Sequence, residues 1–329
     1  MIVGAQGTPG ADGQEGATVD RYFTRQDQVG EGGNDVDDVE PEAEEGDSTG
    51  GAGAGWGQRV TGGIAWGYSP LEQSQWASLS SDWKACGDAS NQSPIDISPG
   101  GAESSTLEGT GPEWTFPVDK AIGSLEPLQN SGTSGGAAWG VTVGWGKAVK
   151  WQGDEYDVVE IVPHTPSEHT IDGGHADLEL QIMLSTGDGQ KLAISLMYSS
   201  EEASEAAQNK AAGGEYDGGV SQLLAFIKGG EAGSSQSASR ALMRLVTSAL
   251  AQGSQQQALA ENAEGSQQTG WYKYEGSLTT PPCTEGVTWL VARAVRSVPR
   301  DQVAALVSVL GMSDRDVQPL GDRVVSVFD

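Results

Sequence analysis

Residues 274–289 read YEGSLTTPPCTEGVTW. The stretch places paired threonines, paired prolines and a cysteine between two runs that contain apolar residues. A sequence this long and this irregular does not arise from composition alone. It therefore decides which fold the rest of the chain is compared with.

Further blocks of aromatic, polar and turn-forming residues flank this stretch on both sides. They are Trp66-Gly67-Tyr68, Trp76, Cys86, residues 91–97 (NQSPIDI), residues 164–173 (HTPSEHTIDG), residues 178–180 (LEL), residues 315–320 (RDVQPL) and residues 323–325 (RVV). From residue 66 to the end, the chain thus reads as one domain.

The segments between these blocks indicate that the domain is mainly β. Short runs rich in Val, Ile and Leu, separated by Gly, Asp and Ser, predict strands at residues 156–162, 178–184 and 191–197. Helical periodicity predicts helices at residues 219–228, 239–251 and 299–310. Two polar stretches predict surface loops, residues 211–219 and 252–270.

Taken together and in this order, the blocks resemble the α-class carbonic anhydrases over residues 64–329. The resemblance implies a mainly β (α+β) fold. It implies a single domain built on a large, twisted, mostly antiparallel sheet of about ten strands, with short peripheral helices. It also implies a conical cleft whose floor holds zinc in active members.

The zinc ligands implied by the resemblance are incomplete in this chain. The family places two histidines two residues apart on one strand, which puts them on one face of the sheet, and a third on the neighbouring strand. Aligned on residues 166–169, PSEH, the three positions fall on Val162, His164 and Gln181. Three imidazoles are what lower the pKa of zinc-bound water to about 7. We therefore expect no bound zinc and no catalytic residue.

A shifted alignment does not restore the ligand set, because the chain has only three histidines. By the resemblance, His169 packs against the carboxylate that matches Glu179. His175 follows two glycines in a turn between strands, where we expect it to be exposed. Neither is expected to bind metal.

Two other features bear on activity. A site of Glu160, His164 and Gln181 is an alternative way to hold zinc, because Glu160 can share the strand face of His164. Its geometry would differ from that of the family. By the resemblance, Thr133 stands where the family has its proton-shuttle histidine, and threonine does not titrate near pH 7.

By the same resemblance, part of the surroundings of the site is retained: Glu168, His169, Glu179 and Thr279. In the family the hydroxyl that matches Thr279 donates to the glutamate that matches Glu168. One interpretation is a retained pocket for a small anion or bicarbonate. The other is a buried hydrogen bond that stabilises the fold.

The chain has two cysteines, Cys86 and Cys283, and they match a disulfide of secreted family members. Such a bond would close a loop of nearly two hundred residues and stabilise the fold by about 5 kcal/mol in a chain-entropy estimate. It implies an oxidising compartment, either extracellular or an organelle lumen such as that of the thylakoid. No targeting segment is recognised in the sequence.

Residues 1–63 differ in character from the rest of the chain. They include an acidic run in which nine of the seventeen residues 31–47 are Asp or Glu, so we expect a tail that is disordered or bound to a partner. Glycines at every third position give Gly-X-Y triplets over residues 4–18. They arise either by chance or from a collagen-like segment, which would make the protein a homotrimer.

Charge and hydropathy exclude two classes of partner. The formal net charge is −28, from 46 acidic and 18 basic residues, which argues against nucleic acid and anionic membrane surfaces. No run of about 18 apolar residues is present, so we expect no membrane span.

The leading hypothesis is a catalytically inactive carbonic-anhydrase-like domain that acts as a binding or structural module in an extracellular or luminal assembly. Its protein partner would be reached through the tail. One alternative is a zinc-dependent carbonic anhydrase with an unorthodox ligand set. A second is an acidic matrix protein that binds calcium through carboxylates of the tail: Asp35, Asp37, Asp38, Glu40, Glu42, Glu44 and Glu45.

Overall fold

The computed structural model describes residues 64, 66–87, 90–104, 111–115, 125–130, 138–143, 147–201 and 270–328. Several sequence predictions lie outside these residues: the tail 1–63 with its triplets 4–18, Thr133, the helices at 219–228 and 239–251, the loop 211–219 and the loop 252–270 except its last residue.

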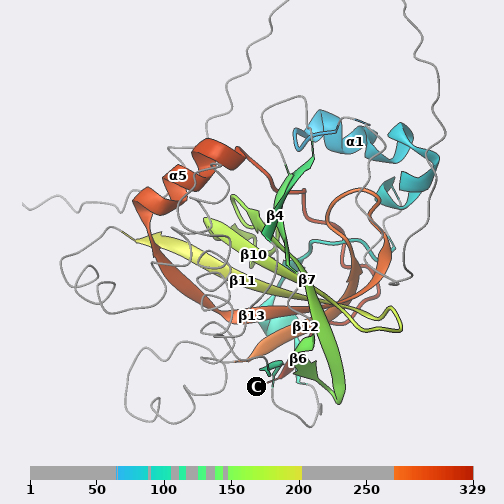
Figure 1. Cartoon of the computed structure of the whole chain (residues 1–329), viewed down its shortest axis with the longest axis vertical. Coiled ribbons are helices and arrows are strands. Elements are labelled where there is room, and N and C mark those ends of the chain that lie inside the picture. Colours follow the sequence, from blue (N-terminus) through green and yellow to red (C-terminus); the bar gives the residue numbers. More distant parts are fainter. Residues whose placement is uncertain are drawn as a thin grey trace, which may run out of the picture. The chain divides into compact units, whose positions relative to one another are not determined.

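The described chain is built on an 11-stranded sheet (Figure 1). Its strands run in the order β2 (Glu103–Ser104), β14 (Ser326–Phe328), β12 (Trp271–Ser277), β13 (Glu285–Pro299), β11 (Lys191–Glu201), β10 (Leu178–Ser185), β7 (Asp154–His164), β5 (Ala138–Val143) and β4 (Leu125–Asn130). Two further strands, β6 (Lys147–Trp151) and β3 (Glu113–Trp114), extend it beside β7. A small second sheet contains β1 (Asp96–Ile97), β8 (Thr170–Ile171) and β9 (Gly174–His175).

Most described strand pairs in the large sheet are antiparallel, and within that sheet only β11–β13 and β14–β2 are parallel among the described pairs. The prediction of a large, mostly antiparallel sheet is therefore confirmed. The three predicted strands are confirmed as the cores of β7, β10 and β11.

Helices are short and few in the described part of the chain: α1 (Pro70–Leu79), α5 (Arg300–Leu310) and two 3-10 helices, η2 (Ser81–Gly87) and η3 (Pro99–Gly101). Helix α1 begins at a capping box, because Ser69 accepts from the backbone of Glu72 while the Glu72 carboxylate accepts from the backbone of Ser69. Helix α5 follows Pro299 and ends at Gly311, which has a positive φ of 68°. The helix predicted at 299–310 is thus confirmed.

Both faces of the central strands are buried, which explains why β10 is apolar at most positions. Leu180 and Ile182 belong to the hydrophobic cluster on one face. Met183 belongs to the cluster on the other face. Since side chains alternate along a strand, Glu179 and Gln181 lie on the same face as Met183. Two polar residues are thereby held inside the protein at the centre of the sheet.

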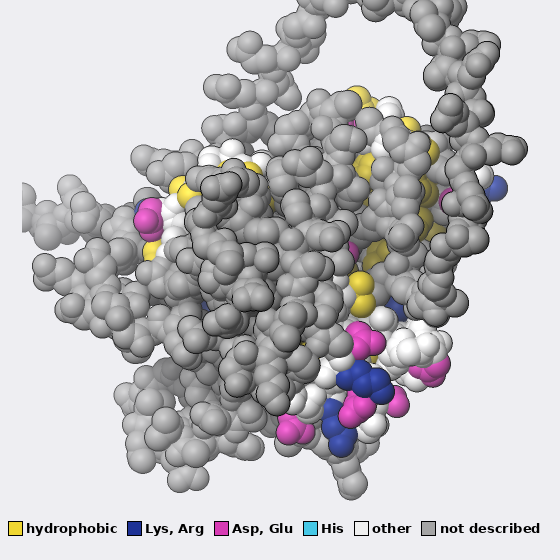
Figure 2. All heavy atoms as spheres, viewed as in Figure 1, with side chains coloured by type: hydrophobic (Ala, Val, Ile, Leu, Met, Phe, Trp, Pro, Cys, Tyr) yellow, Lys and Arg dark blue, Asp and Glu magenta, His cyan; other side chains and the backbone are white. Residues whose placement is uncertain are grey.

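The described surface carries charges of both signs where β6 and β7 reach it (Figure 2). Lys147 and Glu155 form an exposed ion pair there, with 3.2 Å between Nζ and Oε2. Such a pair contributes little to stability. None of the described helices is long and apolar enough to cross a membrane.

Candidate functional site

Strands β7 and β10 bring the three family ligand positions together. Their antiparallel register sets Gln181 opposite Val162 and Glu179 opposite His164. All four side chains therefore share one face of the sheet. Val162, His164 and Gln181 are each at most 1% exposed. We call the buried group formed by Val162, His164, Glu168, Glu179, Gln181 and Thr279 the polar site.

His164 is the one imidazole among the three ligand positions. Its Nδ1 is bonded to the backbone carbonyl of Ser313 and lies 3.4 Å from Oε1 of Glu168. A carbonyl oxygen only accepts, so Nδ1 donates. In the neutral ring, Nε2 then carries the lone pair that could bind a metal. The ring of Tyr68 packs edge-on against it, with centroids 6.3 Å apart.

Gln181 is held by three residues of the polar site. Its Nε2 donates to Oε2 of Glu168 at 2.7 Å and to Oε1 of Glu179 at 3.1 Å. Its Oε1 accepts a longer bond of 3.4 Å from the hydroxyl of Thr279. The amide nitrogen, which has no lone pair for a metal, is thus directed at the carboxylates.

These residues do not fit a zinc ion of the kind that family members use. Val162 has no donor atom, and a neutral amide oxygen is a poor zinc ligand compared with imidazole. Among the described residues, no three His, Cys, Asp or Glu side chains come together as a potential metal centre. The described chain has no histidine triad that binds zinc.

The alternative set that includes Glu160 is also poorly arranged. Glu160 lies opposite Met183 on β10, on the face that carries the polar site. It is four residues from His164, which is about 13 Å along an extended strand. Family ligands on this strand are only two residues apart, about half that distance. Glu160 therefore lies too far along the strand to share a metal ion with His164 in the way that the family ligands do.

A hydrogen-bond network beneath the ligand positions is retained. The carboxylate of Glu179 accepts from the backbone nitrogens of Glu168 at 2.8 Å and His169 at 2.9 Å, and from Nδ1 of His169 at 2.8 Å. Nε2 of His169 lies 2.8 Å from the hydroxyl of Tyr274, which donates to the hydroxyl of Ser93 at 2.8 Å. All of these groups are buried, so each bond compensates for lost hydration.

The pKa values of the two carboxyl groups of the polar site are shifted in opposite directions. Burial, followed by the charge of Glu179, raises the pKa of Glu168 to about 8. Burial would also raise the pKa of Glu179, but the charge of His169 and its hydrogen bonds lower it to about 2. At neutral pH, Glu179 is therefore ionised and Glu168 is largely protonated.

Thr279 and Glu168 lie together in the polar site. A hydrogen bond from the Thr279 hydroxyl is among the contacts that lower the pKa of Glu168 against the effect of burial. The same hydroxyl also reaches Gln181. His175 lies apart from this group, exposed in strand β9, where its Nδ1 is 2.6 Å from the carbonyl oxygen of Ser167.

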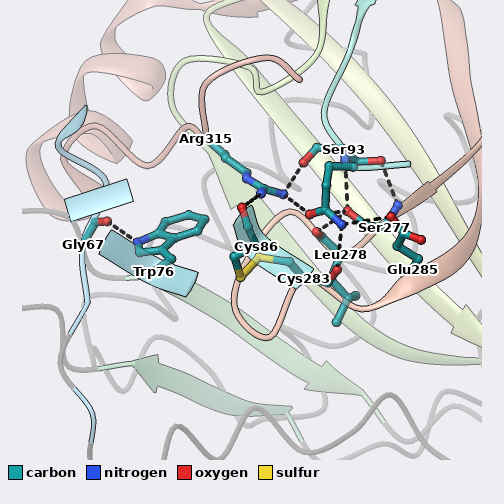
Figure 3. The surroundings of a disulfide bond; sticks show 10 residues. Gly67, Trp76, Cys86, Ser93, Ser277, Leu278, Cys283, Glu285 and Arg315 are labelled. Atoms are coloured by element: carbon teal, nitrogen blue, oxygen red, sulfur yellow. Dashed lines mark hydrogen bonds between the residues drawn. A yellow bond between two sulfur atoms is a disulfide. The ribbon is translucent and has the colours of Figure 1, made fainter. Parts of the chain in front are cut away.

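The predicted disulfide between Cys86 and Cys283 is present and spans 197 residues of sequence. Figure 3 shows the guanidinium of Arg315 directed at this region, where it donates to the carbonyls of Cys86 at 3.2 Å and Ser93 at 2.7 Å. Gln92 donates to the carbonyl of Cys283 at 3.2 Å. A disulfide of this kind indicates an oxidising compartment.

Arg315 also links the disulfide region to the polar site, a role that the sequence analysis did not assign. Its backbone nitrogen donates to Oε1 of Glu168 at 3.0 Å, while its guanidinium lies 5.5 Å from the ring of Trp76. Burial lowers its pKa to about 10. Ser93, Tyr274 and Arg315 each lie in one of the sequence blocks that carry the resemblance. Their position as polar residues inside such blocks is the sequence feature that could have identified them as part of the network.

Comparison with known proteins places this site in a family. Residues 71–328 match the sequence profile of the family described as eukaryotic-type carbonic anhydrase. The chain is 25% identical over 280 residues to alpha carbonic anhydrase 3 of Arabidopsis thaliana, covering 78% of this chain and 82% of the relative. It is 26% identical over 273 residues to dioscorin dioA3 of Dioscorea japonica, covering 79% and 84%.

Solved structures agree on the fold. An α-carbonic anhydrase from Thermovibrio ammonificans in complex with sulfanilamide aligns with a TM-score of 0.56 and 24% identity, over 80% of this chain and 99% of that one. A dioscorin complexed with ascorbate aligns with a TM-score of 0.55 and 24% identity, over 80% and 98%. With the profile match over most of its length, the chain belongs to the eukaryotic-type carbonic anhydrase family.

Proposed function

We propose that this protein is a carbonic-anhydrase-like binding or structural module that binds no zinc and does not hydrate CO₂. One observation carries the proposal: two of the three family ligand positions are Val162 and Gln181, and the amide nitrogen of Gln181 is bonded to carboxylates. One imidazole, that of His164, remains. A single neutral histidine is too weak a donor set for tight zinc binding.

Loss of the metal would remove the nucleophile. Hydration of CO₂ at neutral pH requires a hydroxide, and zinc supplies it by lowering the pKa of bound water to about 7. The groups that remain around His164 are two carboxylates, an amide and a threonine hydroxyl. None of them lowers the pKa of water to that extent, so we expect no turnover.

Relatives support a role other than catalysis. Some members of the family to which this chain is similar carry the name dioscorin, and one dioscorin structure contains ascorbate. The family fold is thus found in proteins named for something other than carbonic anhydrase activity. We propose that this chain likewise uses its surface rather than a metal.

The proposed setting is an extracellular or luminal assembly. The disulfide between Cys86 and Cys283 supports an oxidising compartment. We propose that the tail, residues 1–63, contacts a protein partner, and that Gly-X-Y triplets over residues 4–18 would make the protein a homotrimer if they form a triple helix.

Elemental analysis of the purified chain, together with a CO₂ hydration assay on the same sample, tests the proposal. We expect less than about 0.1 zinc per chain and no turnover above the buffer rate. Near-stoichiometric zinc with turnover would overturn the proposal and favour the enzyme with an unorthodox ligand set. Calcium titration of the chain with and without residues 1–63 tests the acidic matrix protein, for which binding would disappear with the tail.

A further inference from the structure

We infer that Gln181 is a positioning residue that clamps the buried carboxylates of Glu168 and Glu179 and thereby holds the polar site together without a metal. This role of Gln181 concerns the stability of the folded chain and goes beyond the proposed function. It is carried by the two hydrogen bonds that one amide group makes to two different acids.

The chemistry of the amide suits this role. Each hydrogen of an NH₂ group can be donated to a different acceptor, and Nε2 of Gln181 has one carboxylate oxygen at 2.7 Å and another at 3.1 Å. An imidazole nitrogen carries at most one hydrogen, so histidine at this position cannot serve both acids from one atom. Replacement of a ligand histidine by glutamine therefore adds a contact rather than only removing one.

The clamp joins acids that come from separate parts of the chain. Glu179 lies on β10, two residues from Gln181, whereas Glu168 lies between β7 and β8. Both acids are fully buried, so neither side chain has water as a hydrogen-bond partner. A donor shared between them replaces part of that lost hydration at the point where they approach.

Other charged or titratable groups around Gln181 do not duplicate the clamp. His164 faces Glu168 from β7, His169 faces Glu179, and Tyr274 faces His169 from β12. Arg315 reaches Glu168 through its backbone nitrogen. Among these groups, His164 and Arg315 directly contact Glu168 and His169 directly contacts Glu179, whereas the side chain of Gln181 donates to both acids.

Thermal unfolding in the presence of a chelator tests the clamp. Gln181→Leu keeps the size but removes both donors, and we expect its Tm to fall by about 6–12 °C. The matched control is Gln302→Leu in helix α5, because Gln302 is also buried, yet its Oε1 has no hydrogen-bond partner among the described atoms. We expect the control to shift Tm by less than about 3 °C. Equal losses in both variants would overturn the inference.

Gln181→Glu adds a readout that loss of packing would not give. The variant has the same shape but places a third carboxyl among buried acids, which raises its folded-state pKa. A carboxyl with a raised pKa destabilises the fold as pH rises, so the deficit in Tm should widen by roughly 5 °C or more between pH 5 and pH 8. A deficit that does not depend on pH would contradict the clamp. If the variant does not fold at pH 7, recovery of folding at pH 5 is the expected result.

A double-mutant cycle locates the effect. In a Glu168→Leu background the acceptor of one of the two bonds is gone, so Gln181→Leu should cost at most about half of what it costs in the parent. Strictly additive losses would show that Gln181 does not act through Glu168. Because these measurements use chelated protein and no turnover, their outcome is independent of the CO₂ hydration assay.

Discussion

The zinc-ligand positions and the hydrogen-bond network beneath them differ in how closely they follow the family pattern. Of the three positions on β7 and β10 that match family zinc ligands, only His164 is an imidazole. The network beneath them, from Glu179 through His169 and Tyr274 to Ser93, is intact. The supporting network is therefore present in this chain without the three imidazoles of the family.

The difference has a physical reason. In family members that bind zinc, residues at these positions serve the metal, so in the zinc-free chain that we propose they can be any side chain that packs or finds partners. Val162 packs and is 1% exposed, and Gln181 finds acceptors. The supporting groups instead satisfy buried donors and acceptors of the backbone, and removing any of them leaves others unpaired.

Removal of Glu179 should give the largest effect, because this carboxylate accepts from two backbone nitrogens, from His169 and from Gln181. We expect Glu179→Ala to lower the free energy of unfolding by about 5 kcal/mol, measured by urea denaturation. The matched control is Glu275→Ala, an exposed acid paired with Lys273, for which we expect about 0.5 kcal/mol. Comparable losses would show that the supporting network does not stabilise the fold.

Glu168 should give an intermediate effect that depends on pH. Its folded-state pKa of about 8 lies above the ordinary value of 4.5, so the folded protein holds this proton more tightly than the unfolded chain does. Stability contributed by this group is present below pH 4.5 and is lost as pH rises towards 8, on the order of 3 kcal/mol between pH 5 and pH 8.

Glu168→Gln removes this titration, so the unfolding free energy of the variant should fall less over the same range, as measured by urea denaturation at several pH values. Asp314, whose pKa is also raised by burial, contributes equally to both proteins and cancels in the difference. A variant that parallels the parent at every pH would contradict the assignment of the slope to Glu168.

Ser195 should give the smallest effect. It lies opposite Gln181 on β11, and its buried hydroxyl has no hydrogen-bond partner among the described atoms. Ser195→Ala should therefore change the free energy of unfolding by less than about 1 kcal/mol, and a gain in stability is compatible with removal of an unsatisfied group. A loss above about 2 kcal/mol would mean that this hydroxyl belongs to the supporting network.

Local patterns accounted for much of the fold. The apolar runs of β7, β10 and β11 and the proline-to-glycine limits of α5 were readable because each rests on residues close in sequence. The positions of Val162, His164 and Gln181 came from the resemblance, and the register of β7 with β10 brings them to one face.

Long-range contacts were beyond the sequence. The link between Ser93 and Tyr274 joins residues 181 positions apart, and the bond from Arg315 to Glu168 spans 147. Nor does a pattern show that the amide nitrogen of Gln181, rather than its oxygen, faces the acids. That orientation follows only from which partners the folded chain sets around it.

Zinc titration of the natural chain and of Val162→His/Gln181→His, with a competing chelator, tests most directly whether support is retained while chemistry is lost. The account predicts no tight binding by the natural chain. It predicts about one zinc per chain for the double variant, with affinity at least about 10³-fold higher, because three imidazoles would then stand on an intact network. Tight stoichiometric zinc binding by the natural chain, or none by a folded double variant, would contradict it.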